Sequence, residues 1–106
     1  MKCCKITAFI HINCLEAVEE ALKTARVAEV VVSQVKGYGD YKNFYTKDWT
    51  STQARIELFA SHDDVDRIVS VIMGAAHTGL DTDGIIAVLP VETIYRIKDR
   101  APMQCL

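Results

Sequence analysis

Hydrophobic and polar residues alternate regularly in two stretches of the chain, residues 5–13 and residues 54–60. This period of two is typical of β-strands with one buried face. The valine-rich residues 29–36 and the uninterrupted apolar residues 85–91 predict two further strands. In the first strand, the predicted core face comprises Ile6, Ala8, Ile10 and Ile12.

Two stretches between the predicted strands have helical spacing instead. Asn13 is predicted to be an N-cap, with Glu16 three residues later, and the apolar face that follows comprises Leu15, Val18, Leu22 and Ala25. Ser61 is expected to cap a second helix, because aspartates in its first turn complement the helix dipole. Gly79 is expected to end that helix, and its predicted core face comprises Val65, Ile68, Val69, Ile72, Met73 and Ala76.

The order β-α-β-β-α-β predicts an α+β, ferredoxin-like sandwich in a single domain, residues 1–106. A four-stranded antiparallel sheet would carry both helices on one face. Residues 37–52 are expected to form a long loop, residues 93–98 a short edge-like segment and residues 99–106 a C-terminal tail. The uncovered sheet face would be half apolar, which predicts packing against a partner subunit through Phe9, Val31, Val35 and Phe59.

Composition and charge narrow the classes of partner. The 106 residues carry a net charge of −2, which gives no general attraction to nucleic acids or acidic membranes. The longest apolar run, residues 85–91, is far shorter than the ~20 residues that a membrane-spanning helix needs. We therefore expect a cytoplasmic protein without direct membrane insertion, in which any anion site is local.

The four cysteines do not form a metal-binding pattern, because no C-x-x-C is present. Adjacent Cys3 and Cys4 would point to opposite faces of a strand, and reduced thiols are the expected state. A regulatory disulfide between Cys14 and Cys105 is the alternative, because Cys14 lies at a predicted helix start, where a thiol becomes more reactive. The three histidines, His11, His62 and His77, fall on a strand face, a helix start and a helix end. No spacing indicates a catalytic group, so we expect neither a metal site nor an enzyme.

The segment "KGYGDYKNF", residues 36–44, resembles an RNA-recognition signature that begins K-G-Y-G. Asp40 occupies an aromatic position of that signature, and the segment follows the second strand instead of lying on the third. Base stacking needs aromatic side chains on the open sheet face, which a loop does not supply. An RNA-binding module is therefore the less favoured alternative.

A second resemblance extends from Lys5 to Lys98. The segments "VSQVKGYG", "ARIELF" and "AAHTGLDTDGIIAVLPVETIYRIK" resemble the PII signal-transduction family. The most specific parts are T-G-x-x-x-D-G at residues 78–84, the following "VLPVE", and the basic pair Arg96 and Lys98. The resemblance implies a homotrimer built on the open sheet faces, with an adenine nucleotide in each of three clefts between subunits.

The same resemblance implies which residues bind the nucleotide. Gly37, Tyr38 and Gly39 would lie at the base of the long loop, close to phosphate. Thr82, Asp83 and Gly84 would lie in the matching loop of the neighbouring chain. The cations for the phosphate oxygens would be Arg96 and Lys98, which are expected to alternate along one strand edge and to point the same way. The adenine would be surrounded by Val31, Glu57 and Phe59.

The chain departs from the family pattern in its long loop. The modifiable loop of the family carries Y-x-G-x-x-Y, whereas "DYKNFYTKDWTST" is shorter and lacks this motif. A shortened loop is similar to PII-like proteins associated with inorganic-carbon uptake and carboxysome operons. That similarity implies bicarbonate as a second ligand and a carbon transporter or carboxysome-related protein as a partner. A classical nitrogen-regulatory PII protein is the alternative.

Two missing cations predict which nucleotide is preferred. In the family pattern a lysine directly follows the D-G pair, and Ile85 stands there in this chain. An arginine commonly follows the second loop glycine, and Asp40 stands there. Because these cations would neutralise the distal phosphates, we expect ADP or AMP to bind more tightly than ATP.

Overall fold

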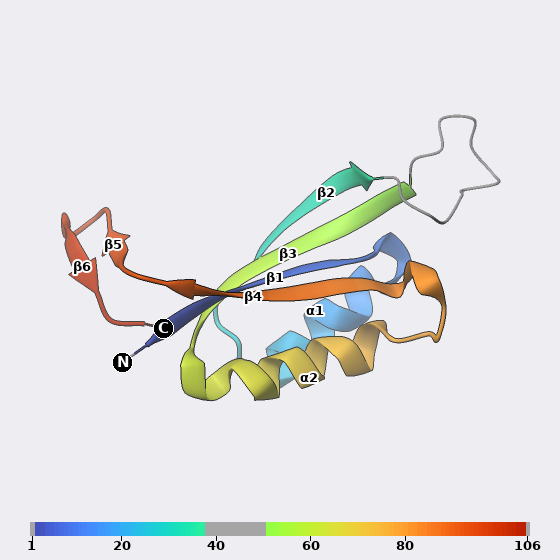
Figure 1. Cartoon of the computed structure of the whole chain (residues 1–106), viewed down its shortest axis with the longest axis horizontal. Coiled ribbons are helices and arrows are strands. Elements are labelled where there is room, and N and C mark those ends of the chain that lie inside the picture. Colours follow the sequence, from blue (N-terminus) through green and yellow to red (C-terminus); the bar gives the residue numbers. More distant parts are fainter. Residues whose placement is uncertain (1, 38–50, 106) are drawn as a thin grey trace.

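A computed structural model describes residues 2–37 and 51–105 (Figure 1). Within these residues, the main sheet comprises β1 (Cys3–His11), β2 (Val31–Gly37), β3 (Ser51–Ser61) and β4 (Gly84–Val91), and the α-helices are α1 (Leu15–Thr24) and α2 (Val65–Ala76). Short 3-10 helices at Ile12–Cys14, His62–Asp64 and Asp81–Asp83 precede α1, α2 and β4. The chain continues into β5 (Ile94–Arg96) and β6 (Ala101–Met103). No helix in the described part of the chain is long and apolar enough to cross a membrane.

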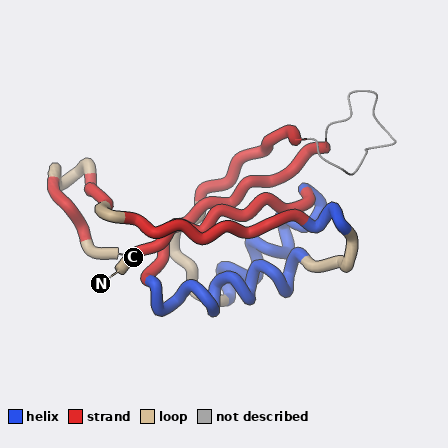
Figure 2. The backbone as a smooth tube through the Cα atoms, in the orientation of Figure 1, coloured by secondary structure: helices blue, strands red, loops and turns tan. Residues whose placement is uncertain are grey.

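The four main strands are ordered β2-β3-β1-β4, and every neighbouring pair is antiparallel. Both α-helices cover one face of this sheet and leave the other face open (Figures 1 and 2). The arrangement confirms the predicted ferredoxin-like fold. β2 and β4 are the two edge strands, and they lie on opposite sides of the sheet.

The hydrophobic core lies between the sheet and the helices and follows the predicted alternation. β1 and β3 pair so that buried residues stand opposite each other, as Ile6 does with Leu58. Met73 was predicted to be in the core, but its side chain is 52% exposed. Ile12 was predicted to continue the first strand, but it lies in the 3-10 turn that follows β1. The helices contribute Val18, Leu22, Val65, Ile68, Ile72 and Ala76 to the core.

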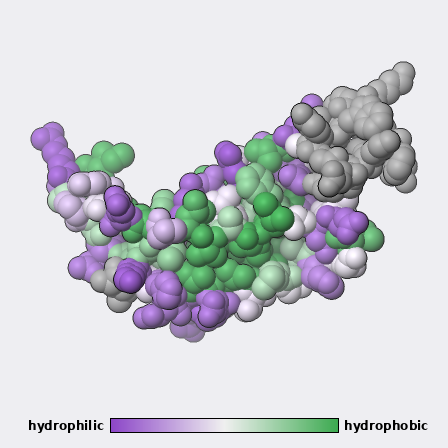
Figure 3. All heavy atoms as spheres, in the orientation of Figure 1, coloured by the Kyte–Doolittle hydropathy of each residue, from purple (hydrophilic) through white to green (hydrophobic). Residues whose placement is uncertain are grey.

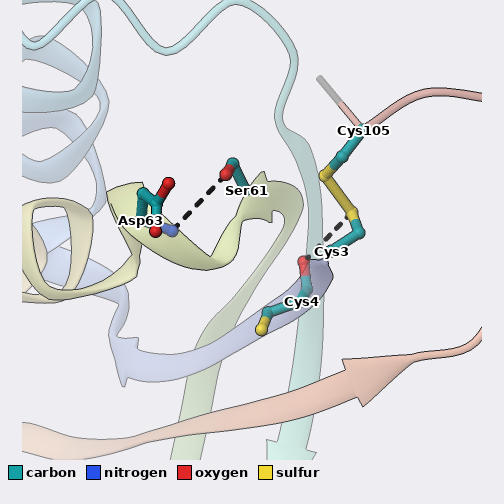
Figure 4. The surroundings of a disulfide bond; sticks show 5 residues. All are labelled: Cys3, Cys4, Ser61, Asp63 and Cys105. Carbon is teal, nitrogen blue, oxygen red and sulfur yellow. Dashed lines mark hydrogen bonds between the residues drawn. A yellow bond between two sulfur atoms is a disulfide. The ribbon is translucent and has the colours of Figure 1, made fainter. Parts of the chain in front are cut away.

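Both α-helices begin with a 3-10 turn that a side chain caps. The Asn13 amide donates a hydrogen bond to His11 Nδ1 at 3.1 Å, so the prediction that Asn13 is the N-cap is wrong. The Asp63 amide donates to Ser61 Oγ at 3.4 Å, as the sequence predicted (Figure 4). α2 ends before Gly79, whose φ of 87° belongs to the loop that follows the helix.

The predicted long loop, residues 37–52, is shortened by strands at both ends. Gly37 is the last residue of β2, and residues 51–52 are the first of β3. The prediction of a loop is therefore wrong for these three positions. The rest of the predicted loop lies outside the described residues.

The C-terminal segment has more regular structure than the sequence predicted. Instead of a single edge-like segment and a tail, β5 and β6 form a hairpin (Figure 1). Its turn includes a hydrogen bond from the Asp99 amide to the Arg96 carbonyl oxygen at 3.2 Å. Lys98 lies in this turn, beyond the end of β5. The expectation that Arg96 and Lys98 alternate along one strand is therefore wrong.

The cysteines also pair differently from both expectations. Cys3 and Cys105 form a disulfide, with Cα atoms 5.4 Å apart (Figure 4). Cys14 is a free thiol whose Sγ lies 3.9 Å from the carbonyl oxygen of Ala76. The alternative pairing of Cys14 with Cys105 is therefore wrong. Cys105 lies at the start of β1, whereas Cys14 lies beyond its end, so the nine residues of this strand, about 30 Å, separate the two cysteines.

Candidate functional site

Three candidate nucleotide residues lie side by side on the open face of the sheet. Val31 of β2 stands opposite Glu57 of β3, and Phe59 is two positions further along β3. The exposed fraction is 69% for Val31 and 39% for Phe59. The fold therefore brings this predicted group together within one chain.

Glu57 is held by two cations on the same sheet face. Lys5 Nζ lies 2.5 Å from one carboxylate oxygen, and Arg55 Nε lies 3.0 Å from the other. Arg55 Nε also donates to Ser33 Oγ at 3.2 Å. The hydrogen bond from Lys5, together with the positive charges of Lys5 and Arg55, lowers the pKa of Glu57. This carboxylate is consequently charged at neutral pH and fixed in position.

The second candidate group lies in the loop between α2 and β4. The Asp83 carboxylate accepts hydrogen bonds from the Thr78 amide at 2.7 Å, from the Gly79 amide at 2.9 Å, and from the Thr78 hydroxyl. These donors, with the Thr78 hydroxyl first, lower the pKa of Asp83. These hydrogen bonds explain why an aspartate occurs in a predicted anion-binding loop: its charge stabilises the loop that leads into β4. Thr82, in the same turn, makes no side-chain hydrogen bond among the described residues.

Gly84 is required by the backbone itself. Its φ of 107° is a conformation that residues with a side chain rarely adopt. A Cβ atom at this position would lie 1.8 Å from the carbonyl oxygen of Phe9, in the neighbouring strand β1. A glycine is therefore needed here whether or not a phosphate approaches the loop.

The surface beside this loop is apolar. A cavity of about 290 Å³ lies between α2 and the start of β4, and its lining includes Val69, Met73, Ile85 and Ile86. Apolar side chains gather on this face between β4 and α2 (Figure 3). Ile85, directly after the D-G pair, is 67% exposed. This position therefore offers no cation to a phosphate group.

The third candidate group is on the hairpin. Arg96 is the last residue of β5, Lys98 follows in the turn, and both are exposed. None of the ion pairs in the described residues includes either side chain. Both cations are therefore available to an anionic ligand.

The base of the long loop is described only at its first residue. Gly37 ends β2, and a Cβ atom there would make ordinary contact, 3.5 Å from Gln53 Oε1. The fold of the single chain does not require a glycine at this position. Tyr38, Gly39 and Asp40 lie outside the described residues.

The three groups do not meet within one chain. Gly37 and Gly84 lie toward the same end of the sheet but on its opposite edge strands, β2 and β4. Arg96 lies beyond the other end of β4, so the eight residues of that strand, about 26 Å, separate it from Gly84. A site that uses all three groups needs residues from more than one subunit.

No metal centre is evident in the part of the chain that the structure describes. Within residues 2–37 and 51–105, no group of three or more His, Cys, Asp or Glu side chains is arranged to hold a metal ion.

Comparison with known proteins assigns the family. The chain matches the family model described as nitrogen regulatory protein P-II over residues 3–101. The chain belongs to the PII family. It is 34% identical over 102 residues to the nitrogen regulatory protein P-II of Azospirillum brasilense, and 31% identical over 102 residues to that of a Synechocystis strain. Each match covers 89% of this chain and 90% of the relative.

A solved PII structure supports the same assignment. The crystal structure of Arabidopsis thaliana PII bound to citrate is similar to this fold with a TM-score of 0.83 and 27% sequence identity. The similarity covers 97% of this chain and 90% of that chain. The family description is that of a regulatory protein, and the Arabidopsis PII protein of this comparison is bound to citrate.

Sequence analysis of this PII chain missed three side chains that hold the candidate residues. Lys5 and Arg55 fix Glu57, and Thr78 fixes Asp83. The Arg55–Glu57 contact could have been found, because residues two apart on a strand share a face. The Lys5 contact depends on the register of β1 against β3, which sequence alternation does not determine.

Proposed function

We propose that this PII protein is a homotrimer that binds an adenine nucleotide between subunits and prefers ADP or AMP over ATP. The observation that carries the proposal is the separation of the candidate residues onto opposite edges of one sheet. Val31, Glu57 and Gly37 belong to the β2 side, whereas Asp83 and Gly84 belong to the β4 edge. Residues that one chain holds apart in this way can meet when subunits are arranged around a symmetry axis.

The open sheet face supports the trimer. The helices cover one face only (Figure 2). The uncovered face carries apolar side chains on both edge strands, β2 and β4. Val31, Ile85 and Leu89 are 69%, 67% and 46% exposed. Apolar surface of this kind on a single chain is typical of a subunit interface.

The charges around the candidate phosphate positions support the nucleotide preference. Ile85 supplies no charge where the family pattern has a lysine, while Arg96 and Lys98 remain unpaired by any carboxylate in the described residues. A charge-assisted phosphate contact contributes roughly 1.5–3 kcal/mol. Its loss weakens binding about tenfold to a hundredfold, and we assign this loss to the γ-phosphate.

Titration calorimetry with AMP, ADP, ATP and a single-stranded RNA tests the proposal, with light scattering on the same samples. We expect a mass of three 11.8 kDa chains and a lower Kd for ADP or AMP than for ATP. A stable monomer at micromolar concentration would contradict the trimer. An ATP preference of tenfold or more would contradict the charge argument, and RNA binding without nucleotide binding would favour the RNA-binding alternative.

Two regulated processes fit this nucleotide sensor. The short loop favours inorganic-carbon uptake or metabolism, with bicarbonate as the second ligand and a carbon transporter or carboxysome-related protein as the partner. The name of the relatives, nitrogen regulatory protein P-II, favours nitrogen regulation as the second candidate. Calorimetric titration of bicarbonate into the ADP complex separates them, because the carbon role requires saturable binding and the nitrogen role does not.

A further inference from the structure

The C-terminal hairpin is attached to the rest of the molecule at two points. Residues 92–93 lead into it from β4, and the disulfide joins Cys105, just after β6, to Cys3 at the start of β1 (Figures 1 and 4). β5 and β6 pair with each other as a separate two-stranded sheet. In the described residues, no hydrogen bond or ion pair links either strand to the main sheet or the helices. The disulfide is therefore the second anchor of the hairpin.

The two sulfur atoms lie where a reagent can reach them. Cys3 and Cys105 are both partly exposed, whereas the adjacent Cys4 is 6% exposed and faces the core. A cavity of about 290 Å³ lies beside the bond, and its lining includes Cys3, Cys105, Val91 and Met103. Because this cavity separates the base of the hairpin from the end of the main sheet, little packing replaces the disulfide if it breaks.

We propose that Cys3 and Cys105 form a reversible thiol–disulfide exchange site that controls the position of the hairpin. A dithiol reductant supplies the electrons. One of its thiolates attacks a sulfur of the protein disulfide, the S–S bond breaks, and a mixed disulfide forms. The second thiol of the reductant then displaces the protein thiol. Two electrons and two protons end on Cys3 and Cys105, and the reductant leaves as a disulfide.

The released hairpin carries Arg96 and Lys98, so the site couples redox state to ligand binding. This second step rests on the proposed function, in which both cations contact phosphate. In the oxidised protein the hairpin has two anchors, and these cations are held at a defined distance from the main sheet. In the reduced protein one anchor remains, and nucleotide binding must order the hairpin at an entropic cost.

The remaining cysteines provide a matched control. Cys14 is a free thiol near the opposite end of β1, next to the carbonyl oxygen of Ala76. Cys14→Ser removes one thiol without touching the hairpin, whereas Cys105→Ser removes the anchor. Cys14 packs against the hydrophobic core but is not one of its buried residues, and Cys105 lies outside the core.

The experiment compares the full chain after treatment with oxidised or reduced dithiothreitol. Alkylation of the unfolded protein counts thiols, hydrogen exchange reports on residues 94–103, and calorimetry measures ADP binding. We expect two alkylated cysteines in the oxidised protein, the free Cys4 and Cys14, and all four in the reduced protein. Reduction should speed exchange in the hairpin and weaken ADP binding at least about fivefold. Cys105→Ser should behave as reduced in both conditions, and Cys14→Ser should respond as the wild type does.

Four alkylated cysteines after oxidation, or equal hairpin exchange in both states, would overturn the exchange site. If exchange changes but ADP binds both states with the same Kd, the coupling to the nucleotide is overturned. If the oxidised protein does not bind ADP although its hairpin responds to reduction, the proposed function fails and control of the hairpin position stands.

Discussion

The loop that precedes β4 and the hairpin that follows it both carry candidate ligand residues, but they are stabilised in opposite ways. In the loop, Asp83 accepts hydrogen bonds from Thr78 and Gly79, and Gly84 fits closely against β1. In the hairpin, Arg96 and Lys98 belong to none of the ion pairs among the residues described, and one disulfide provides the second anchor. A substitution in the loop therefore tests folding as well as binding, whereas a substitution of a hairpin cation tests binding alone.

The largest expected effect is that of Gly84→Ala in the loop. The new methyl group would lie 1.8 Å from the Phe9 carbonyl oxygen, and φ is 107°. The strands must separate or the loop must change conformation, so we expect the free energy of unfolding to fall by about 4 kcal/mol or more. Urea denaturation followed by circular dichroism measures this change.

Gly37→Ala is the matched control, because its new methyl group would be in ordinary contact with a side chain. The free energy of unfolding should change by less than about 1 kcal/mol, while ADP binding weakens if the Gly37 backbone approaches phosphate. Equal stability of the two variants would contradict the distinction between a glycine that the fold requires and one that it does not.

The contrast between loop and hairpin also marks the limit of sequence prediction. Alternation, the valine-rich and apolar runs and helical spacing identified the main strands, both α-helices and the uncovered face, because each is a local signal that extends over several residues. The hairpin was missed because β6 has three residues and no alternation long enough to indicate a strand. The Cys3–Cys105 disulfide was missed because residues 102 apart in sequence meet only once β4 and the hairpin have turned the chain back to β1.

For a related reason, the sequence predicted only some of the relations among the candidate site residues. The family resemblance grouped Glu57 with Phe59, and both lie on one face of β3, since residues two apart on a strand share a face. The partner of Asp83 was missed, because T-G-x-x-x-D-G was interpreted through its glycines and not through the donors of Thr78. Arg96 and Lys98 were expected to alternate along one strand, but a turn of the chain begins directly after Arg96.

The second prediction adds to β4 the charge that the family pattern has there. Ile85→Lys should strengthen ATP binding about tenfold or more and leave AMP binding nearly unchanged, because the new ammonium group would reach the distal phosphates. Ile85→Gln is the control, because it also replaces the apolar side chain with a polar one but adds no charge. Calorimetry with ATP and AMP measures both effects, and equal gains for the two variants would show that charge is not the cause.

The third prediction concerns a hairpin cation that has no structural partner in the described chain. Arg96→Ala should weaken ADP binding by roughly tenfold and AMP binding less, because AMP lacks the second phosphate. Thermal unfolding should be unchanged. Arg100→Asn is the control, since Asn tolerates the positive φ of 53° at that position of the same turn. A loss of stability in Arg96→Ala, or an equal loss of ADP binding in Arg100→Asn, would contradict the claim that the hairpin cation affects binding alone.

The smallest expected effect is a difference between the loop and the hairpin in their response to pH. The pKa of Asp83 is lowered by its hydrogen bonds with Thr78 and Gly79, so the folded loop favours the charged carboxylate. Its contribution to stability is fully present above the ordinary carboxyl pKa and is lost as the pH falls through the lowered value, below about pH 4. The hairpin's disulfide does not titrate. In NMR spectra recorded from pH 7 to pH 2, the amide resonances of Thr78 and Gly79 should therefore shift as Asp83 is protonated, at a lower pH than an ordinary carboxyl group requires. The resonances of the hairpin strands should not follow this titration. Asp83→Asn should abolish the shift, whereas Asp81→Asn, in the same turn, should leave it in place. Simultaneous shifts in loop and hairpin would mean that the two regions open as one unit, and that the loop does not depend on the Asp83 charge.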